Sequence, residues 1–347
     1  MKTKRLAIIG LAALLGGLLW AGAAPARVIT DMAGRQVTVP ERVTRVWATA
    51  PPATYMVYAL GPDLLAGLNS PPPETTREFM APGFRQLPVL GGWFGQGRMV
   101  NREALLLARP DVVVSFHWRG RSVTWKINET LEPLGLPVAD MVIGGMDDYP
   151  AVFRFLGRLC DRQERGEALA RYAEETLAAM ARLRASLPPE ERLTVYYAEG
   201  LQGLQTECDS SFHAELIKLC GGVNAHRCQA RTIYGMDSIS LEQVLAYDPQ
   251  VILTAAPEFR QAVSQDPRWQ GVAAVKAKRI HLIPTVPMNW FDRPPTFMRL
   301  MGAHWLANQL YPQRYPLDLA AEAMRFYQLF LGVEIDRATA QRLLGRE

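Results

Sequence analysis

Aromatic and arginine side chains follow several predicted β-strands, and they are the residue types in this chain best suited to binding a ligand. Together with His117 and Glu199, which follow strands in the same way, they are Trp47, Trp93, Phe94, Arg98, Trp118 and Arg119 in the first half and Tyr197, Arg231, Tyr234, Trp290, Phe291 and Arg293 in the second half. Ligands of open parallel sheets lie beyond the carboxyl ends of the strands, so we expect these side chains to meet at one cleft. Aromatic faces beside cations suit a bulky, flat or anionic organic ligand.

Four arginines and one histidine indicate which kind of ligand this cleft would bind. Guanidinium groups bind anionic oxygens in paired hydrogen bonds, so the arginines favour a ligand that carries such oxygens. His117 follows a β-branched strand, where it could complete the coordination of a metal or could be an ordinary polar residue at a strand end. The arginines concerned are Arg98, Arg119, Arg231 and Arg293.

Motifs for catalysis are missing from the sequence. It has 5 histidines, with no H-E-x-x-H and no G-x-S-x-G pattern. The glycine-rich stretch at 90–98 has neither the dinucleotide-binding nor the P-loop spacing. An enzyme is therefore the less favoured alternative.

Two stretches share one pattern and define the elements that must position these side chains. Residues 101–114 read NREALLLARPDVVV and residues 240–253 read SLEQVLAYDPQVIL. Each has a polar N-cap, a glutamate in the first helical turn (Glu103 or Glu242), an apolar helix, a proline and a β-branched strand. Helix and strand alternate in both halves, so we predict an α/β fold of two Rossmann-like lobes with parallel sheets.

Between the two lobes, residues 147–187 predict a helical linker. Its apolar residues recur at helical spacing until Pro188 and Pro189. The polar stretch 161–167 could divide it into two helices, of which the second, about 20 residues long, would span roughly 30 Å. The predicted lobes are thus 27–146 and 188–347, the latter with closing helices, and the ligand cleft lies between them.

The first 26 residues have the pattern of a signal peptide. Lys2, Lys4 and Arg5 precede an apolar run at 6–20, and Ala24-Pro25-Ala26 is an A-x-A cleavage site. We expect cleavage after Ala26, with cleavage after Ala23 as the alternative, and a soluble, exported, periplasmic protein. The net charge is only +4, with no later Lys/Arg cluster, so nucleic acid is not an expected partner.

The sequence contains 4 cysteines, which allow three pairings. Cys208 and Cys228 flank one predicted helix in loop-like surroundings and are the favoured disulfide, because export exposes a chain to oxidising conditions. The same two cysteines with His213 and His226 are an alternative zinc cluster, although they lack CxxC spacing.

With these residues in view, the chain resembles the substrate-binding proteins of ABC importers that have a helical linker between their lobes and bind ferric siderophores, haem, cobalamin and related metal chelates. The resemblance covers nearly all of the sequence after residue 26. It rests on VITDMAGRQVTVP at 28–40, the two repeated stretches, WFDRPP at 290–295 and WLANQLYP at 305–312.

The resemblance implies function and partners. It implies that a monomer without a cofactor of its own captures a metal chelate, most simply a ferric siderophore, and delivers it to an ABC permease and its ATPase. Haem, cobalamin and nickel or cobalt chelates stay open. Glu103 and Glu242 match the positions at which one glutamate of each lobe docks onto permease arginines.

A receptor for a free metal ion is the other alternative. Such a site needs several converging histidines and carboxylates, whereas the predicted cleft contains more aromatics and arginines than ligands. Bare metal salts compared with preformed chelates would distinguish the two.

Overall fold

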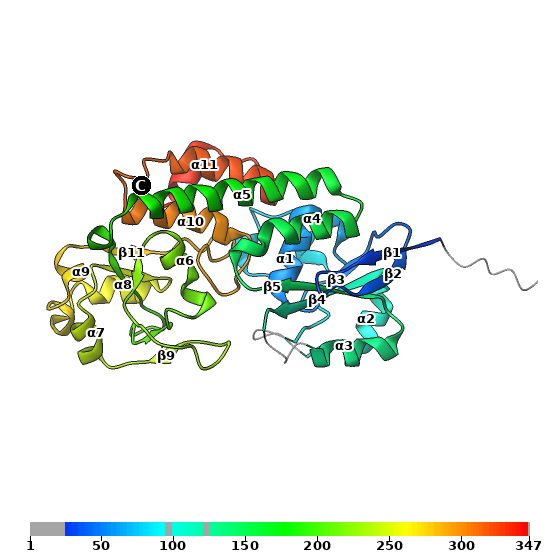
Figure 1. Ribbon diagram of the computed structural model, residues 1–347, viewed down its shortest axis with the longest axis horizontal. Helices are drawn as coiled ribbons and strands as arrows, with labels where there is room; N and C mark the ends of the chain where they lie inside the picture. Colours follow the sequence, from blue (N-terminus) through cyan, green and yellow to red (C-terminus); the bar gives the residue numbers. More distant parts are fainter. Residues whose placement is uncertain (1–24, 94–98, 121–124, 346–347) are drawn as a thin grey trace, which may run out of the picture.

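The computed structural model describes residues 25–93, 99–120 and 125–345, and it contains two parallel sheets in two lobes joined by a long helix (Figure 1). The sheet of the first lobe has the order β3-β4-β5 and that of the second lobe β11-β10-β6-β8. The two-lobed α/β prediction is confirmed. The strands are β3 (Val46–Ala48), β4 (Val112–Trp118) and β5 (Val138–Ile143), then β6 (Thr194–Tyr197), β8 (Val223–Asn224), β10 (Val251–Thr254) and β11 (Ile280–Leu282).

Two small antiparallel pairs accompany these sheets. β1 (Ala26–Thr30) pairs with β2 (Gln36–Pro40), and the chain turns at Gly34, whose φ of +83° suits glycine. β7 (Gln205–Thr206) pairs with β9 (Asp237–Ser238), so two loops of the second lobe lie side by side.

The repeated sequence pattern forms the same unit in each lobe. Asn101 caps α2 (Arg102–Ala108) and Ser240 caps α7 (Leu241–Tyr247), each through its side-chain oxygen. Both helices end at a left-handed residue before the proline, and β4 or β10 follows. Both strands are completely buried along their valines and isoleucine, which explains their β-branched composition.

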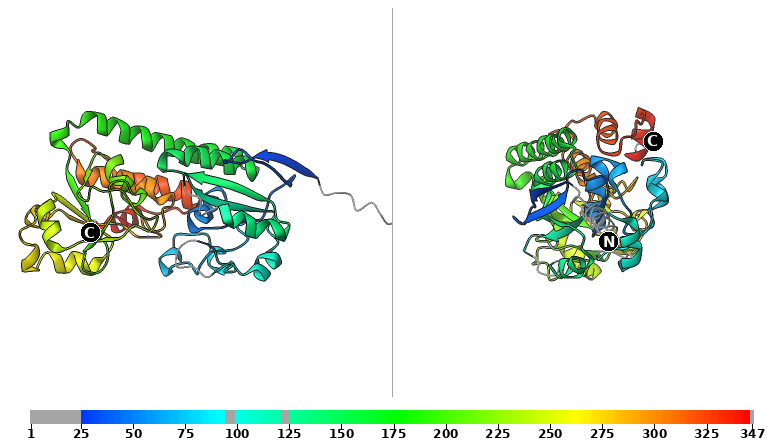
Figure 2. Two further views of the ribbon diagram at one scale, coloured as in Figure 1. Left: turned by 60° about the horizontal axis from the view of Figure 1, so that its bottom comes forward. Right: turned by 90° about the vertical axis from the view of Figure 1, so that its right-hand side faces the viewer.

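The predicted linker is two helices that pack against each other. α4 (Tyr149–Leu159) lies on the first lobe, the chain turns at Asp161, and α5 (Gln163–Ser186) runs back beside it (Figure 2). Arg154 of α4 pairs with Glu167 and Glu174 of α5 at 2.8 and 2.6 Å. The crossing from lobe to lobe is therefore made by α5, whose 24 residues span about 36 Å, and not by the whole of 147–187.

The closing helices belong to both lobes rather than to the second lobe alone. α10 (Met298–Leu310) packs on α5 and α6, whereas the π-helical turn Tyr327–Leu331 after α11 (Leu319–Phe326) contacts α1 (Pro51–Leu60) of the first lobe. The Tyr58 hydroxyl donates to the carbonyl oxygen of Leu331 at 3.1 Å. The remaining α-helices are α3 (Trp125–Leu131), α6 (Glu215–Leu219), α8 (Pro257–Val263), α9 (Ala273–Lys276) and α12 (Arg337–Leu343).

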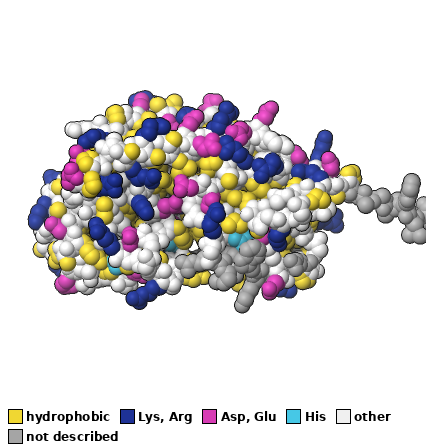
Figure 3. Space-filling view, viewed as in Figure 1, with side chains coloured by type: hydrophobic (Ala, Val, Ile, Leu, Met, Phe, Trp, Pro, Cys, Tyr) yellow, Lys and Arg dark blue, Asp and Glu magenta, His cyan; other side chains and the backbone are white. Residues whose placement is uncertain are grey.

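Among the described residues, none of the helices has the length and hydropathy needed to cross a membrane. Figure 3 shows acidic and basic side chains interspersed over the face in view, without the extended basic surface that nucleic acid requires.

The α4–α5 packing depends on two facing glycines. A Cβ atom on Gly166 would lie 2.6 Å from the carbonyl oxygen of Phe153 and 3.0 Å from the Cα of Gly157. Both are backbone atoms, so neither can move without shifting a helix.

We expect Gly166→Ala to lower the free energy of unfolding by about 1–3 kcal/mol, although alanine favours helix. Urea unfolding measures this change. Gly83→Ala is the control, because a Cβ there meets nothing within 4 Å. An equal effect of both substitutions would contradict the packing argument.

Candidate functional site

The two lobes meet where Trp118, the last residue of β4, faces Phe212 of the second lobe. Their ring centroids are 4.0 Å apart with planes inclined by 30°. Trp118 also makes an edge-to-face contact with Phe116 of its own strand at 5.2 Å. We call the surroundings of this aromatic pair the interlobe junction, namely the Trp118–Phe212 pair, the strand-end residues 118, 119 and 199, and the loop residues 144–148, 207–215, 292 and 293.

A buried ion pair fixes Phe212 and links the lobes. Arg299 of α10, only 1% exposed, donates to the Phe212 carbonyl and contacts Glu215, both at 2.9 Å. The other carboxylate oxygen of Glu215 accepts from the Met146 amide of the first lobe at 2.9 Å. Glu215 therefore links Arg299 to the first lobe, and each charge of the pair has a close partner of opposite sign.

Arg119 lies on the first-lobe side of the interlobe junction and is already paired. Its guanidinium contacts the carboxylate of Asp148, which also accepts from the Gly144 amide. The arginine side chain is 62% exposed, so this pair contributes little to stability. Arg119 is thus held at the surface of the junction by an acid just before α4.

Arg293 is the centre of the charges on the second-lobe side. It bonds to Glu199 at 2.8 Å and to Glu207, and it lies 3.4 Å from Asp292. Burial lowers the pKa of its guanidinium, but the three carboxylates outweigh burial and raise it overall. Three acids around one arginine make this side of the junction acidic rather than basic.

Glu199 is the acid of this cluster with the clearest perturbation. The residue is 7% exposed, and its burial raises the pKa of the carboxyl to about 7, partly opposed by Arg293 and reinforced by Glu207 and Asp292. The carboxyl therefore changes charge near neutral pH at the edge of the interlobe junction.

His213 and Asp292 form a buried pair beside Phe212. The Nδ1 atom of His213 lies 2.5 Å from Asp292, and its Nε2 atom lies 3.0 Å from the Ile233 carbonyl. Both ring nitrogens of His213 face hydrogen-bond acceptors at this position. His213 is therefore absent from the cysteine cluster that the sequence suggested.

His117 is also committed to the protein. The residue is 2% exposed and its Nε2 atom lies 2.8 Å from Asp140, which in turn contacts Arg35 and Asn128. This network lies in the first-lobe interior, so His117 serves the packing of β4 against β5 and not a metal in this conformation.

Several predicted ligand residues lie in the packed interior. Successive side chains of a strand point to opposite faces, so the strand-end rule also collects core residues. Trp93 is half-buried and lies 5.9 Å from Trp47, while Arg231 and Tyr234 are exposed on the second lobe. Phe94 and Arg98 lie outside the described residues. Those at most 2% exposed are Trp47, His117, Tyr197, Trp290 and Phe291.

Three important residues of the interlobe junction are not among those predicted from the sequence. Phe212 begins a short helical turn, Glu207 follows a two-residue strand, and Asp292 precedes Arg293. Only Asp292 had a sequence signal, its place beside a selected arginine. Phe212 and Glu207 reach the junction through loops whose paths the periodicity of the chain does not predict.

Glu103 and Glu242 are exposed in the first turns of α2 and α7, as the repeat predicted. Both helices lie on the side of the molecule away from α5 (Figure 1). Exposed apolar side chains accompany them, with Leu107 82%, Met99 78% and Leu245 39% exposed. Each lobe thus presents an acid beside apolar surface on one common side.

Two parallel-sheet lobes on one connecting helix, with aromatic and charged residues where they meet, define a two-lobed binding protein. A sequence model of the family named Periplasmic binding protein matches residues 93–287. The chain belongs to this family, which consists of binding proteins and not of enzymes.

Individual relatives agree with this family. A solved ABC transporter solute-binding protein from Sulfurospirillum deleyianum is 40% identical with a TM-score of 0.85, over 91% of this chain and 98% of that one. The molybdate-binding protein MolA of Haemophilus influenzae is 25% identical over 95% of this chain and 97% of its own. A vitamin B12-binding protein of Yersinia pestis is 24% identical over 79% and 89%. The chain is accordingly a solute-binding protein of an ABC transporter.

The raised pKa of Glu199 predicts a pH dependence of stability. The folded protein holds the Glu199 proton more tightly than the unfolded chain does. The contribution of this proton to the free energy of unfolding is therefore complete below about pH 4.5 and is lost as pH rises through about 7. Glu199→Gln keeps an oxygen for Arg293 and cannot ionise. We expect the variant to gain about 1–3 kcal/mol relative to wild type between about pH 5 and about pH 8, by urea unfolding.

Glu190→Gln is the matched control, since Glu190 is exposed in the turn after α5. Its stability should run parallel to wild type over the whole pH range. Parallel behaviour of Glu199→Gln would show that burial does not penalise the Glu199 charge.

Proposed function

We propose that this protein captures a metal chelate at the interlobe junction and delivers it to an ABC permease and its ATPase, with a ferric siderophore as the first candidate. It acts as a periplasmic monomer after removal of residues 1–26. Haem, cobalamin and nickel or cobalt chelates are the other members of this ligand class.

The single observation that carries the proposal is the contact of Trp118 and Phe212 across the two lobes, with centroids 4.0 Å apart. A flat or aromatic organic ligand that separates these rings gains contact with both lobes at once. Such a ligand buries apolar surface worth about 25 cal/mol per Å². The organic part of a chelate has this surface.

The charges of the interlobe junction favour a chelate over a bare oxyanion. Arg119 and Arg293 are both engaged by carboxylates, so the guanidinium groups are not free to the extent that the sequence suggested. A small oxyanion would have to displace these acids, whereas a chelate gains most from the aromatic faces.

Molybdate is nevertheless a second candidate, because the similarity to the molybdate-binding protein extends over nearly the whole of both chains. The two candidates make different demands on Trp118. A chelate stacks on the indole, whereas an oxyanion depends on hydrogen-bond donors and leaves the indole almost unused.

A binding panel identifies the ligand class. The protein without residues 1–26 is titrated with ferric catecholates and hydroxamates, haem, cobalamin, nickel and cobalt chelates, molybdate and bare metal salts, by calorimetry and tryptophan fluorescence. Trp118→Ala should weaken chelate binding about tenfold or more, or about 1.4 kcal/mol, and Trp118→Phe should retain most of the affinity.

Each outcome of the panel has a defined meaning. Binding of molybdate alone, with unchanged affinity in Trp118→Ala, would establish the second candidate. Binding of bare metal salts would establish a free-ion receptor. No response to any chelate would refute the proposed ligand class.

Docking to the permease is proposed through Glu103 and Glu242. Two carboxylates on separate lobes can engage two sets of arginines, so that one contact raises the effective concentration for the other. The apolar side chains beside each acid, Leu107 and Leu245, supply surface for the same contact.

We expect Glu103→Lys with Glu242→Lys to reduce ligand uptake by cells about tenfold or more, because reversed charges repel the arginines. Ligand affinity of the purified double variant should equal that of wild type. Cellular uptake of labelled ligand and calorimetry measure the two quantities.

Glu164→Lys is the matched control for this experiment. Glu164 is an exposed first-turn glutamate too, but on α5, which lies on the opposite side of the molecule (Figure 1). Its reversal should leave uptake unchanged. Normal uptake by the double variant, or an equal loss in Glu164→Lys, would remove the docking assignment.

A further inference from the structure

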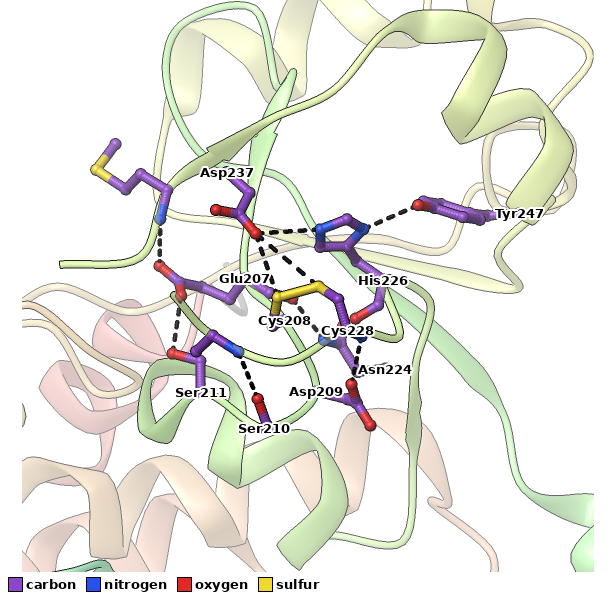
Figure 4. Close-up of a disulfide and its surroundings, with 12 residues drawn as sticks. Glu207, Cys208, Asp209, Ser210, Ser211, Asn224, His226, Cys228, Asp237 and Tyr247 are labelled. Carbon is purple, nitrogen blue, oxygen red and sulfur yellow. Dashed lines mark hydrogen bonds and ion pairs between the residues drawn. A yellow bond between two sulfur atoms is a disulfide. The ribbon is translucent and has the colours of Figure 1, made fainter. Parts of the chain in front are cut away.

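The disulfide of the second lobe lies within a set of metal-ligating side chains. The structure joins Cys208 to Cys228, as the sequence favoured. The ligand atoms of Cys208, His226, Cys228 and Asp237 all lie within 4.8 Å of one another. Figure 4 shows the Asp237 carboxylate directed at the two sulfurs and the His226 imidazole directed at that carboxylate. Asp237 occupies the place in the cluster that the sequence assigned to His213.

The carboxylate of Asp237 has an unusual position for a disulfide neighbour. Its Oδ2 atom lies 3.2 Å from the sulfur of Cys208 and 3.9 Å from that of Cys228. A disulfide has no hydrogen to donate, so these are contacts and not hydrogen bonds. Two thiols, by contrast, would donate hydrogen bonds to this oxygen, and a metal ion would be coordinated by it.

The imidazole of His226 is oriented for coordination through Nε2. That atom lies 3.3 Å from Asp237, while Nδ1 lies 2.8 Å from the hydroxyl oxygen of Tyr247. If Nδ1 carries the hydrogen and donates to Tyr247, the lone pair of Nε2 faces the cluster. A hydrogen bond of this kind is the usual second-shell support of a metal-ligating histidine.

Besides the disulfide, several hydrogen bonds hold the loops together. The Asn224 amide donates to the Glu207 carbonyl at 2.6 Å, and the Asp209 amide donates to the His226 carbonyl at 3.0 Å. The Cys228 amide donates to the Asp209 carboxylate at 2.7 Å. Opening the sulfur–sulfur bond therefore leaves both cysteines side by side.

The cluster is accessible from outside. It lines an open pocket of about 650 Å³ on the second lobe, together with Arg231 and Gln229. Cys208 is only 2% exposed and Cys228 is half-buried, so a reductant reaches the disulfide from the side of Cys228. Of the residues that line this pocket, Cys208 alone belongs to the interlobe junction, so the cluster adjoins the proposed ligand site at the loop 207–215.

We propose that Cys208, Cys228, His226 and Asp237 form a redox-dependent site for a thiophilic divalent cation such as Zn²⁺. A dithiol reductant transfers two electrons and two protons, the sulfur–sulfur bond breaks, two thiols form, and the reductant becomes a disulfide. Binding of Zn²⁺ then releases the two thiol protons and completes a tetrahedral set of two thiolates, one imidazole and one carboxylate. Oxidation removes both thiolates and with them the affinity.

Cobalt absorption tests this site in the full mature chain. The protein is reduced with a phosphine, which takes oxygen from water to become the phosphine oxide while the two water hydrogens go to the thiols, and is titrated with Co²⁺ and then with Zn²⁺. We expect about one Co²⁺ per reduced chain, with thiolate-to-cobalt charge-transfer and tetrahedral d–d absorption that Zn²⁺ abolishes. The oxidised chain should bind at least about 100-fold more weakly.

Matched variants identify the ligands. Cys208→Ser with Cys228→Ser should lose the charge-transfer band, and Asp237→Asn should weaken binding about tenfold or more. Cys160→Ala with Cys220→Ala is the control, because these free cysteines are buried elsewhere, and it should keep the band.

Four results would overturn the site. They are an absent band in the reduced chain, equal affinity in the oxidised chain, a band that survives Cys208→Ser with Cys228→Ser, and loss of the native circular dichroism on reduction. The last result would show that the hydrogen bonds between the loops do not hold the cluster without the disulfide.

Discussion

The packing of α4 against α5 is the constraint on which the rest of the structure depends. Two glycines let the helices approach so closely that backbone touches backbone at Gly157 and Gly166. α5 then carries the chain from one lobe to the other as a continuous helix, which resists bending more than a loop would. The distance between the sheets is thereby set, and Trp118 and Phe212 can meet. The ion pair of Arg299 and Glu215 adds a second fixed point near that meeting.

The junction between the lobes combines aromatic contact with internally balanced charge. Buried charges are tolerated when their partners are close, and Arg293 has three acidic partners. This arrangement holds the loop after Trp290 in place at the cost of leaving fewer free cations for a ligand. It also places a carboxyl, that of Glu199, where its charge depends on pH near neutrality. A ligand that neutralises the charges of this cluster, or that excludes water from it, therefore also alters the protonation of Glu199.

The two lobes share one αβ unit but differ in what their loops add to it. In both, a capped helix with a first-turn glutamate precedes a buried central strand. The second lobe alone adds the β7–β9 pair, whose loops bring Cys208, His226 and Asp237 together. The common unit places Glu103 and Glu242 in exposed first turns on one side of the molecule. The added loops account for the junction acids and for the cysteine cluster.

Local patterns in the sequence determined the parts of this protein that depend on neighbours along the chain. The caps Asn101 and Ser240, the hairpin at Gly34, the buried strands and the break after α4 follow from residue type and spacing, because hydrogen bonds and periodicity act over a few residues. The tertiary structure alone decided which strand-end residues face the junction. Trp290 and Trp118 follow the same sequence rule, yet one is buried in the core and the other contacts Phe212. That choice, like the presence of Asp237 rather than His213 beside the two cysteines, depends on how loops distant in sequence pack, and no local periodicity encodes it.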